Sequence, residues 1–533
     1  MEKVKKPFNF PSAFSILFVI LIVAVILTWV VPSGSYSKLT YDGINNQFVV
    51  KTYQQEDKIY PATEETLDKL NIKINLANFT EGTIKKPIAI PGTYQRVQQN
   101  PKGIGDIAVS MVHGTIEAAD IMVFIFVLGG MIGVINRTGA FNSGLMALAR
   151  RTKGREFTIV FSVSVLMVIG GTTCGIEEEA VAFYPILVPV FLALGYDAII
   201  CVGAIFLASS MGTAFSTINP FSVVIASNAA GIPFTEGMGF RFVGLILGAA
   251  CVIYYLYWYG KKVKANPEFS YTYADRESFV EQYMKGFNPD DVVAFTIRRK
   301  IILALFCIAF PIMVWGVMAG GWWFPQMAAS FLTITILIMF ISGLSEKEIV
   351  NAFTHGASEL VAVSLIIGMA RGVNLVLEEG MIPDTILAYT SQLVSGMPPS
   401  LFILGQLVIF IFLGLVVPSS SGLAVLAMPI MAPLADAVGI PRFIVVSAYN
   451  WGQYAMLFLA PTGLVLVTLQ MLNIPFNKWV KFVMPMIAAL LIIGATLLVV
   501  QVSLWSLRRI GQKRSCFGGH CAYWTKKELF AIR

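Results

Sequence analysis

Long apolar runs recur from one end of the sequence to the other. Several approach the length of about 20 residues that a helix needs to cross the hydrocarbon of a membrane. Hydrophobic residues make up 56% of the 533 and charged residues 13%, whereas soluble domains are only about half apolar and about a quarter charged. The sequence therefore predicts an all-α, polytopic protein of the lipid bilayer. The clearest runs are residues 14–31, 121–135, 301–318, 331–343 and 480–504.

The flanking charges predict how the chain is oriented. The run 14–31 follows Lys3, Lys5 and Lys6, and it exceeds the apolar core of about 7 to 15 residues found in signal peptides. We therefore expect a retained helix with a cytoplasmic N-terminus in the cell membrane. Basic clusters near residues 150–155, 261–264 and 298–300 are expected on the cytoplasmic side. The net charge of +7 thus indicates membrane orientation and not a nucleic-acid partner.

The sequence gives little support to metal, ATP or enzyme chemistry. The 6 cysteines and 3 histidines lack the spacing of a zinc site or a disulfide framework, and there is no GxxxxGK[ST] phosphate loop. The serines of residues 418–422 have no histidine nearby in sequence that would make one of them a nucleophile. We expect neither an enzyme nor a cofactor or metal, so transport would have to be secondary.

Two parts of the chain resemble each other at an offset of about 240 residues. Residues 175–195 parallel 422–439, and residues 209–234 parallel 449–476. The shared landmarks, in order, are flanking glycines, a PxxxP pair (Pro185 and Pro189; Pro429 and Pro433), a Gly (Gly212; Gly452), a Pro (Pro220; Pro461) and an IPF ending. Secondary transporters are often built from two such halves, inverted in the membrane, with the binding site where interrupted helices meet.

Each half contains two interruptions. The first is a polar tip between apolar arms, at residues 170–175 and at 418–422. The arms 157–169 and 403–417 look too short to span the membrane, which favours re-entrant hairpins. The second is a break in a helix, at Pro220 and at Pro461. Proline deletes an amide donor and frees backbone groups that substrate or ions can use.

These elements give about nine crossings and two hairpins. The crossings are expected near 14–31, 119–136, 198–230, 236–259, 300–318, 322–343, 359–377, 442–472 and 479–505, the hairpins near 157–194 and 400–436, and short interfacial helices within 106–120 and 383–396. The expected parts are a cytoplasmic N-terminus (1–13), a first repeat (14–259, with an external loop 32–103), a cytoplasmic loop and linking helix (260–321), a second inverted repeat (322–507) and a disordered basic tail (508–533).

Three strings carry a resemblance to a known family. The first tip GGTTCGIEEEA, the broken helix INPF with IASNAAGIPF, and the second tip VPSSSGLAVLAMPIMAPLAD resemble the anaerobic C4-dicarboxylate carrier family, in particular its YfcC-type branch, which includes arginine/ornithine antiporters. The resemblance covers about residues 11–507. It implies the hairpins, broken helices and inverted repeats of the ion transporter superfamily, and assembly as a homodimer.

Charge bears on the class of substrate. Glu177, Glu178 and Glu179 lie together within an apolar stretch, where a single carboxylate costs about 2.5 to 3.5 kcal/mol. No lysine or arginine occurs at a tip or break. Arg371, which Glu378 and Glu379 follow, is expected to form a structural ion pair or to extend its charge toward the membrane surface. A cationic amino acid, exchanged in the manner of arginine and ornithine, is therefore favoured over a dicarboxylate.

Capping of a helix start is the simpler role for the three glutamates. At most one or two of them should face a cavity, with Glu177 or Glu178 nearest.

The candidate residues share a position at a tip or a break. They are Thr172, Thr173, Gly175, Glu177, Glu178, Glu179, Thr217, Asn219, Ser419, Ser420, Ser421, Gly422, Asn450 and Thr462 for substrate, and Pro220 and Pro461 for the helix breaks. The alternative is a carrier of C4-dicarboxylates, other amino acids or peptides coupled to Na⁺ or H⁺, with oxygen ligands from Thr217, Asn219 and freed carbonyls. A channel is a third possibility, and trans-stimulation would exclude it.

Overall fold

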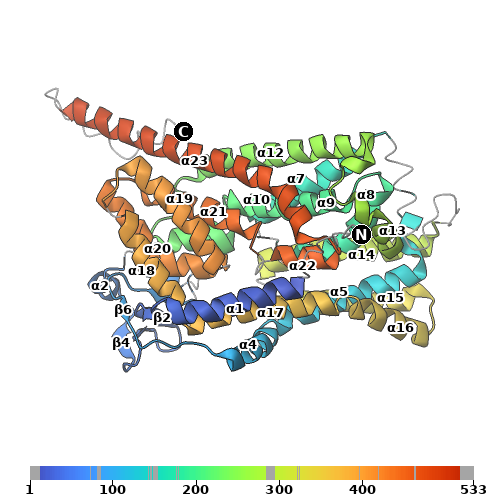
Figure 1. Cartoon of the computed structure of the whole chain (residues 1–533), viewed down its shortest axis with the longest axis horizontal. Helices are drawn as coiled ribbons and strands as arrows, with labels where there is room; N and C mark the ends of the chain where they lie inside the picture. Colours follow the sequence, from blue (N-terminus) through green and yellow to red (C-terminus); the bar gives the residue numbers. More distant parts are fainter. Residues whose placement is uncertain are drawn as a thin grey trace, which may run out of the picture.

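The computed structural model describes residues 13–516 apart from 73, 81–83, 85, 142, 145, 146, 148–153, 174, 176, 178, 284–294, 321, 323, 395, 418 and 461–463. Helices dominate and most run along one common direction (Figure 1). Five described helices are long and apolar enough to cross a membrane: α5 (Ala119–Thr138), α12 (Met238–Ala265), α15 (Phe324–Ser342), α19 (Pro399–Val416) and α23 (Phe476–Cys516). The chain is thus a mostly helical, polytopic membrane protein, as predicted. The number of crossings stays a prediction.

The remaining helices fill the expected positions and add some that were not expected. They are α1 (Ala13–Val30), α4 (Ile104–Glu117), α7 (Phe157–Thr173), α8 (Tyr184–Ala193), α14 (Ile297–Gly320), α16 (Glu346–Ser358), α17 (Val361–Glu379), α18 (Ile382–Val394) and α20 (Ser420–Val438), with shorter turns α2 (Glu64–Lys69), α3 (Ala77–Thr80), η1 (Glu179–Phe183), η4 (Pro267–Phe269), η5 (Tyr273–Asp275) and α13 (Arg276–Tyr283). The helices α4 and α18 occupy the two segments predicted as short helices. The unexpected α16 begins at Ser345, whose hydroxyl accepts the amide of Glu348, a capping box.

Small residues allow several of these helices to pack closely. In Figure 1, α1 and α17 run along one side of the molecule and α12 and α23 along the opposite side, with α7 and α10 (Ala208–Ala214) between them. A Cβ added at Gly212 of α10 would lie 2.4 Å from the carbonyl oxygen of Val168 on α7. Glycine is therefore required at this crossing, because close helix approach in membranes depends on small residues.

Both predicted helix interruptions are present. The first helix passes through α9 (Ala198–Val202), η2 (Gly203–Leu207) and α10, stops, and resumes as η3 (Pro220–Val224) and α11 (Ile225–Ala229). Pro220 occupies the first position of the second piece, where its missing amide costs no hydrogen bond. The second helix stops after α21 (Arg442–Leu457) and resumes as α22 (Leu464–Met471). Pro461 itself lies outside the described residues.

The expected all-α fold is wrong for the loop 32–103. Strands β1 (Gly34–Ser35) and β6 (Gln95–Arg96) form one antiparallel pair, and β2 (Lys38–Asp42), β3 (Gln47–Lys51), β4 (Lys58–Pro61) and β5 (Ile88–Ala89) form a sheet in the order β4-β3-β2-β5. The sequence Gln47–Lys51 alternates half-buried and buried side chains, the period of a strand with one buried face. We call residues 34–96 the β-sheet subdomain.

The β-sheet subdomain is fixed to the helical body at two places. Its apolar core, which includes Leu39 and Phe48, extends onto Val425 of α20. Its first strand is held at the junction of α17 and α18, where the amide of Tyr36 donates to Asp384 over 3.0 Å and Gly34 donates to the Met381 carbonyl over 3.2 Å. The strands lie beside α18 and α20 in Figure 1.

Two further expectations need correction. The arm α19 is 18 residues long, so its length alone does not exclude a full crossing, contrary to the shorter arm expected from 403–417. The last helix α23 continues for 41 residues to Cys516, a length of roughly 60 Å, so the beginning of the expected disordered tail is helical. Residues 517–533 lie outside the described residues.

The Gly212 crossing can be tested with two matched substitutions. Gly212→Ala should lower the free energy of unfolding by about 1 to 3 kcal/mol, because the added methyl group overpacks the contact with α7. Gly239→Ala, where no atom lies within 4 Å of the added Cβ, should leave stability unchanged or slightly higher. Thermal unfolding in detergent measures both, and equal stability of the two variants would contradict the close crossing.

Candidate substrate-binding site

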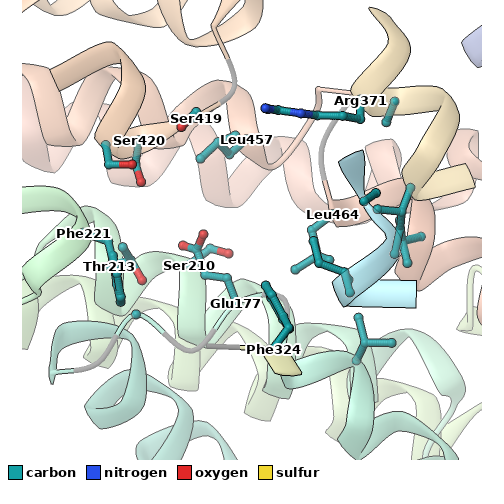
Figure 2. A pocket seen from close by; sticks show the side chains of 18 of the residues that line it. Glu177, Ser210, Thr213, Phe221, Phe324, Arg371, Ser419, Ser420, Leu457 and Leu464 are labelled. Carbon is teal, nitrogen blue, oxygen red and sulfur yellow. The ribbon is translucent and has the colours of Figure 1, made fainter. Parts of the chain in front are cut away.

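One cavity brings both tips and both interrupted helices together. Its volume is about 460 Å³. In the close view of Figure 2, Glu177, Ser210 and Thr213 lie on one wall, and Ser419, Ser420 and Arg371 lie across the open space from them. The main polar or charged lining residues are Lys86, Glu117, Asp120, Glu177, Ser210, Thr213, Asn219, Arg371, Asn374, Ser419, Ser420, Ser421 and Tyr454.

The first tip is held to the broken helix by hydrogen bonds. The chain leaves α7 through Gly175, whose φ of +68° favours glycine. Asn219 donates from Nδ2 to the Gly171 carbonyl over 2.7 Å, and its Oδ1 accepts the amides of Phe221 and Ser222 over 2.8 and 3.2 Å. Asn219 is completely buried. This one side chain therefore caps the second helix piece and fixes it to the tip.

Thr172 and Thr217 add a second connection behind the cavity. The amide of Thr217 donates to the Thr172 hydroxyl over 3.1 Å, and the two hydroxyls lie 3.4 Å apart. Thr213 of α10 donates to the Gly171 carbonyl over 3.2 Å. The polar groups freed by the break are thus used mainly within the protein, so the first tip and the first broken helix form one unit.

The second tip is organised differently. Ser419 caps α20, since its hydroxyl accepts the amide of Gly422 over 3.1 Å. The carbonyl of Ser420 accepts a hydrogen bond from Tyr449. Ser421 accepts one from Nζ of Lys86 over 2.9 Å. The N-terminus of α20, where the helix dipole is positive, therefore opens on the cavity beside a lysine from the β-sheet subdomain.

Two cations and three acids line the cavity within the described part of the chain. Arg371 pairs with Glu117, with 2.8 Å between Nε and Oε2, while Asp120 and Glu177 line the cavity as well. The expected pairing of Arg371 with Glu378 or Glu379 is wrong, because Glu379 pairs with Lys102 over 2.6 Å. The expected lack of lysine at the tips is also wrong, since Lys86 reaches the second one.

Long-range contacts set the electrostatics around Lys86. Partial removal from water and the positive charge of Arg371 lower the pKa of Lys86, and the charge of Glu378 offsets part of this shift.

On the other side of the cavity, the Tyr454 hydroxyl interacts with Ser420 of the second tip and with Glu177 of the first. Tyr454 of α21 thereby connects the two tips.

The structure brings only part of the predicted set to the cavity. Gly175, Glu177, Asn219, Ser419, Ser420 and Ser421 line it. Thr172 and Thr217 lie behind it, Gly422 serves the cap of α20, and Thr173 donates to the Ile169 carbonyl of its own helix over 2.7 Å. Glu178, Thr462 and the side chain of Glu179 lie outside the described residues.

Asn450 does not line this cavity although it was a candidate. It is completely buried on α21, and neither of its amide atoms has a hydrogen-bond partner within the described ranges. Its counterpart in the repeat, Ser210, does line the cavity. The repeat therefore relates the two positions along the chain without giving them the same surroundings.

Several lining residues were missed. Glu117 and Asp120 flank the start of an apolar run, and carboxylates at that position are a signal that the sequence does contain. Ser210 and Thr213 precede the first break by one to two helical turns and could have been found from the repeat. Lys86 offered no local signal, because its contact spans 335 residues of sequence.

Asn219 provides a test of the first tip. Asn219→Ala should lower the free energy of unfolding by about 2 kcal/mol or more, because it removes a cap and one of the two donors to the buried Gly171 carbonyl, and it should slow transport. Asn266→Ala removes a comparable cap at an exposed turn, where Asn266 accepts the amide of Glu268 over 3.1 Å, and should cost about 1 kcal/mol or less with normal transport. Similar losses in both variants would contradict a special role for Asn219.

Comparison with known proteins gives the family. The family model for the C4-dicarboxylate anaerobic carrier, DcuC, matches residues 10–503. An uncharacterized protein of Haemophilus influenzae is 79% identical over 506 residues, which are 95% of this chain and 99% of that protein. The putative basic amino acid antiporter YfcC of Escherichia coli is 29% identical over 501 residues, 92% of this chain and 93% of that protein.

Two solved transporters are similar at a lower level. The YdaH transporter of Alcanivorax borkumensis has a TM-score of 0.37 and 13% identity, with 93% of this chain and 99% of that one covered. MtrF of Neisseria gonorrhoeae, of a class of antimetabolite efflux pumps, has a TM-score of 0.36 and 14% identity, with 92% and 95% covered. Scores this low do not establish a shared fold. The match of the family model over nearly the whole chain does establish the family: this chain is a membrane transporter, not an enzyme, and belongs to the C4-dicarboxylate anaerobic carrier family.

Proposed function

We propose that the chain exchanges cationic amino acids, of the arginine and ornithine type, by alternating access. The observation that carries this proposal is the distribution of charge around the cavity. Lys86 and the N-terminus of α20 lie at the second tip, while Glu177 projects from the first tip across the open space (Figure 2). A molecule with a carboxylate at one end and a cation at the other fits these two walls.

The balance of charge favours a monovalent cation. The described lining residues carry two positive charges, on Lys86 and Arg371, and three negative charges, on Glu117, Asp120 and Glu177. A cationic amino acid adds one net positive charge and neutralises the site. A dicarboxylate would add two negative charges to a site that is already negative, in surroundings where unbalanced charge is costly.

The second tip suits the α-carboxylate. Amides at a helix start and the hydroxyls of Ser420 and Ser421 are groups that bind carboxylates, and Lys86 adds a charge-assisted donor. On the opposite wall, Glu177 would accept hydrogen bonds from the guanidinium or ammonium group. Since the entering and leaving amino acids carry the same charge, their exchange needs no ion gradient.

The transport cycle is part of the same proposal. We infer that the two tips are re-entrant hairpins in inverted repeats covering residues 14–259 and 322–507, that the protein is a homodimer of the cell membrane, and that its N-terminus is cytoplasmic. The printed name of the Escherichia coli relative, a putative basic amino acid antiporter, supports the substrate class. Movement of the hairpins and broken helices would open the cavity to each side in turn.

Counterflow in liposomes tests the proposed function. Liposomes loaded with unlabelled arginine or ornithine should accumulate labelled arginine without a Na⁺ or pH gradient, and empty liposomes should not. A channel would show no such trans-stimulation. Exchange of succinate without exchange of arginine would contradict the proposal.

Glu177 is the residue to change first. Glu177→Gln should raise the apparent KM for arginine by about 10- to 100-fold, the effect of losing one charge-assisted hydrogen bond. Glu268→Gln, which removes an exposed carboxylate from η4, is the matched control and should have no effect. An unchanged KM in Glu177→Gln would leave Glu177 with a capping role only.

A coupled dicarboxylate carrier is the second candidate. Lys86 and Arg371 give the cavity two cations, as many as a dicarboxylate has charges, and the name of the family points to the same substrates. Coupling to Na⁺ or H⁺ would use oxygen atoms near the first break, including those of Thr217 and Asn219. Labelled succinate uptake that depends on a Na⁺ or pH gradient would support this candidate.

A further inference from the structure

Lys86 enters the cavity from a part of the chain that lies outside the tips and broken helices. It belongs to the β-sheet subdomain, two residues before β5, which pairs with β2. Ile84 and Ile88, on either side of Lys86, are both buried in the core that includes Val425 of α20. The backbone is therefore anchored before and after Lys86, so the side chain is directed at the second tip by a packed core and not by a loose loop.

Two positive groups act on Lys86 at the second tip, the N-terminus of α20 and Arg371. The Lys86 Nζ donates to Ser421 over 2.9 Å, in the first turn of α20, where the helix dipole favours anions and disfavours cations. Arg371 lines the same cavity. Within the described part of the chain, no carboxylate forms an ion pair with Lys86, whereas Arg371 is paired with Glu117. A cation at the positive end of a helix, with no ion pair among the described residues and only the more distant charge of Glu378 to offset it, is arranged to receive an anionic group.

We infer that Lys86 determines specificity by binding the carboxylate of the substrate, and that the β-sheet subdomain is therefore part of the binding site. This inference rests on the proposed function for the identity of the substrate. The substrate need not carry a positive charge elsewhere, because Lys86 would bind any substrate carboxylate placed at the second tip. Recognition of the carboxylate would then depend on a segment outside the tips and broken helices that the repeat relates.

Arginine and agmatine separate this role from a structural one. Agmatine keeps the guanidinium group of arginine but has no carboxylate. Lys86→Gln should weaken binding of arginine by about 10- to 100-fold, as expected for a lost charge-assisted hydrogen bond, and should leave binding of agmatine unchanged or slightly tighter. Lys86→Arg, which keeps a cationic donor, should recover part of the arginine affinity.

The experiment measures binding of arginine and agmatine to purified full-length protein by calorimetry, and inhibition of counterflow by each. Lys58→Gln is the matched control, since Lys58 is exposed on β4 of the same subdomain and should behave as the wild type. Equal losses of arginine and agmatine binding in Lys86→Gln would indicate a structural role and overturn the inference.

Succinate separates failure of this inference from failure of the proposed function. If the wild type binds succinate and not arginine, the proposed function is wrong, and a loss of succinate binding in Lys86→Gln would still support the role of Lys86. If the wild type binds arginine and Lys86→Gln binds it equally well, the proposed function stands and Lys86 has no part in recognition. The inference is overturned whenever neither arginine nor succinate binding depends on Lys86.

Discussion

Charged groups inside a predominantly apolar chain must be balanced, because an unpaired charge away from water is costly. The cavity of this protein meets that constraint only in part. Arg371 and Glu117 form an ion pair, while Lys86 donates to the Ser421 hydroxyl at a helix start, where the positive end of the dipole does not stabilise a cation. The described residues leave one net negative charge around the space, and this imbalance is the physical reason for which we propose a cationic substrate.

At both tips the backbone has polar groups without helical partners, and the two tips satisfy these groups with different side chains. At the first tip, Asn219 ties the Gly171 carbonyl to the start of η3, so the freed backbone groups are satisfied internally. At the second tip, Ser419 caps α20 and Ser421 is satisfied by Lys86 from a distant segment. The first tip contributes a carboxylate and the second a positive helix end. The two halves of the site are related in sequence but differ in charge, so a molecule with a cation at one end and a carboxylate at the other can align between them.

The local features of the fold were readable from the sequence, and the contacts between distant segments were not. Pro220, Gly175 and the serines of the second tip mark interruptions because of their own backbone and hydrogen-bonding properties, and the structure places those interruptions where the sequence predicts them. The pairing of Arg371 and the presence of a lysine at the second tip depend on tertiary contacts, and both were predicted wrongly. Lys86 lies 335 residues from Ser421, and Arg371 lies 254 residues from Glu117, so no periodicity or spacing could relate them.

The β-sheet subdomain shows the same limit. Its strands are short and β3 alternates in burial, a weak signal beside the long apolar runs, and composition alone therefore predicted an external polar loop. Its core packs on Val425, and the subdomain contributes Lys86 to the lining of the cavity. The charges around the cavity therefore come from the helices and from the subdomain together.

In the proposed complex, one molecule spans the two walls with its carboxylate at the second tip and its cation at the first. An experimental structure of the full chain with saturating arginine tests this most directly. The account predicts density across the cavity, with the carboxylate beside Lys86 and Ser421 and the guanidinium group beside Glu177. An empty cavity under those conditions, or arginine bound in the reverse orientation, would contradict it.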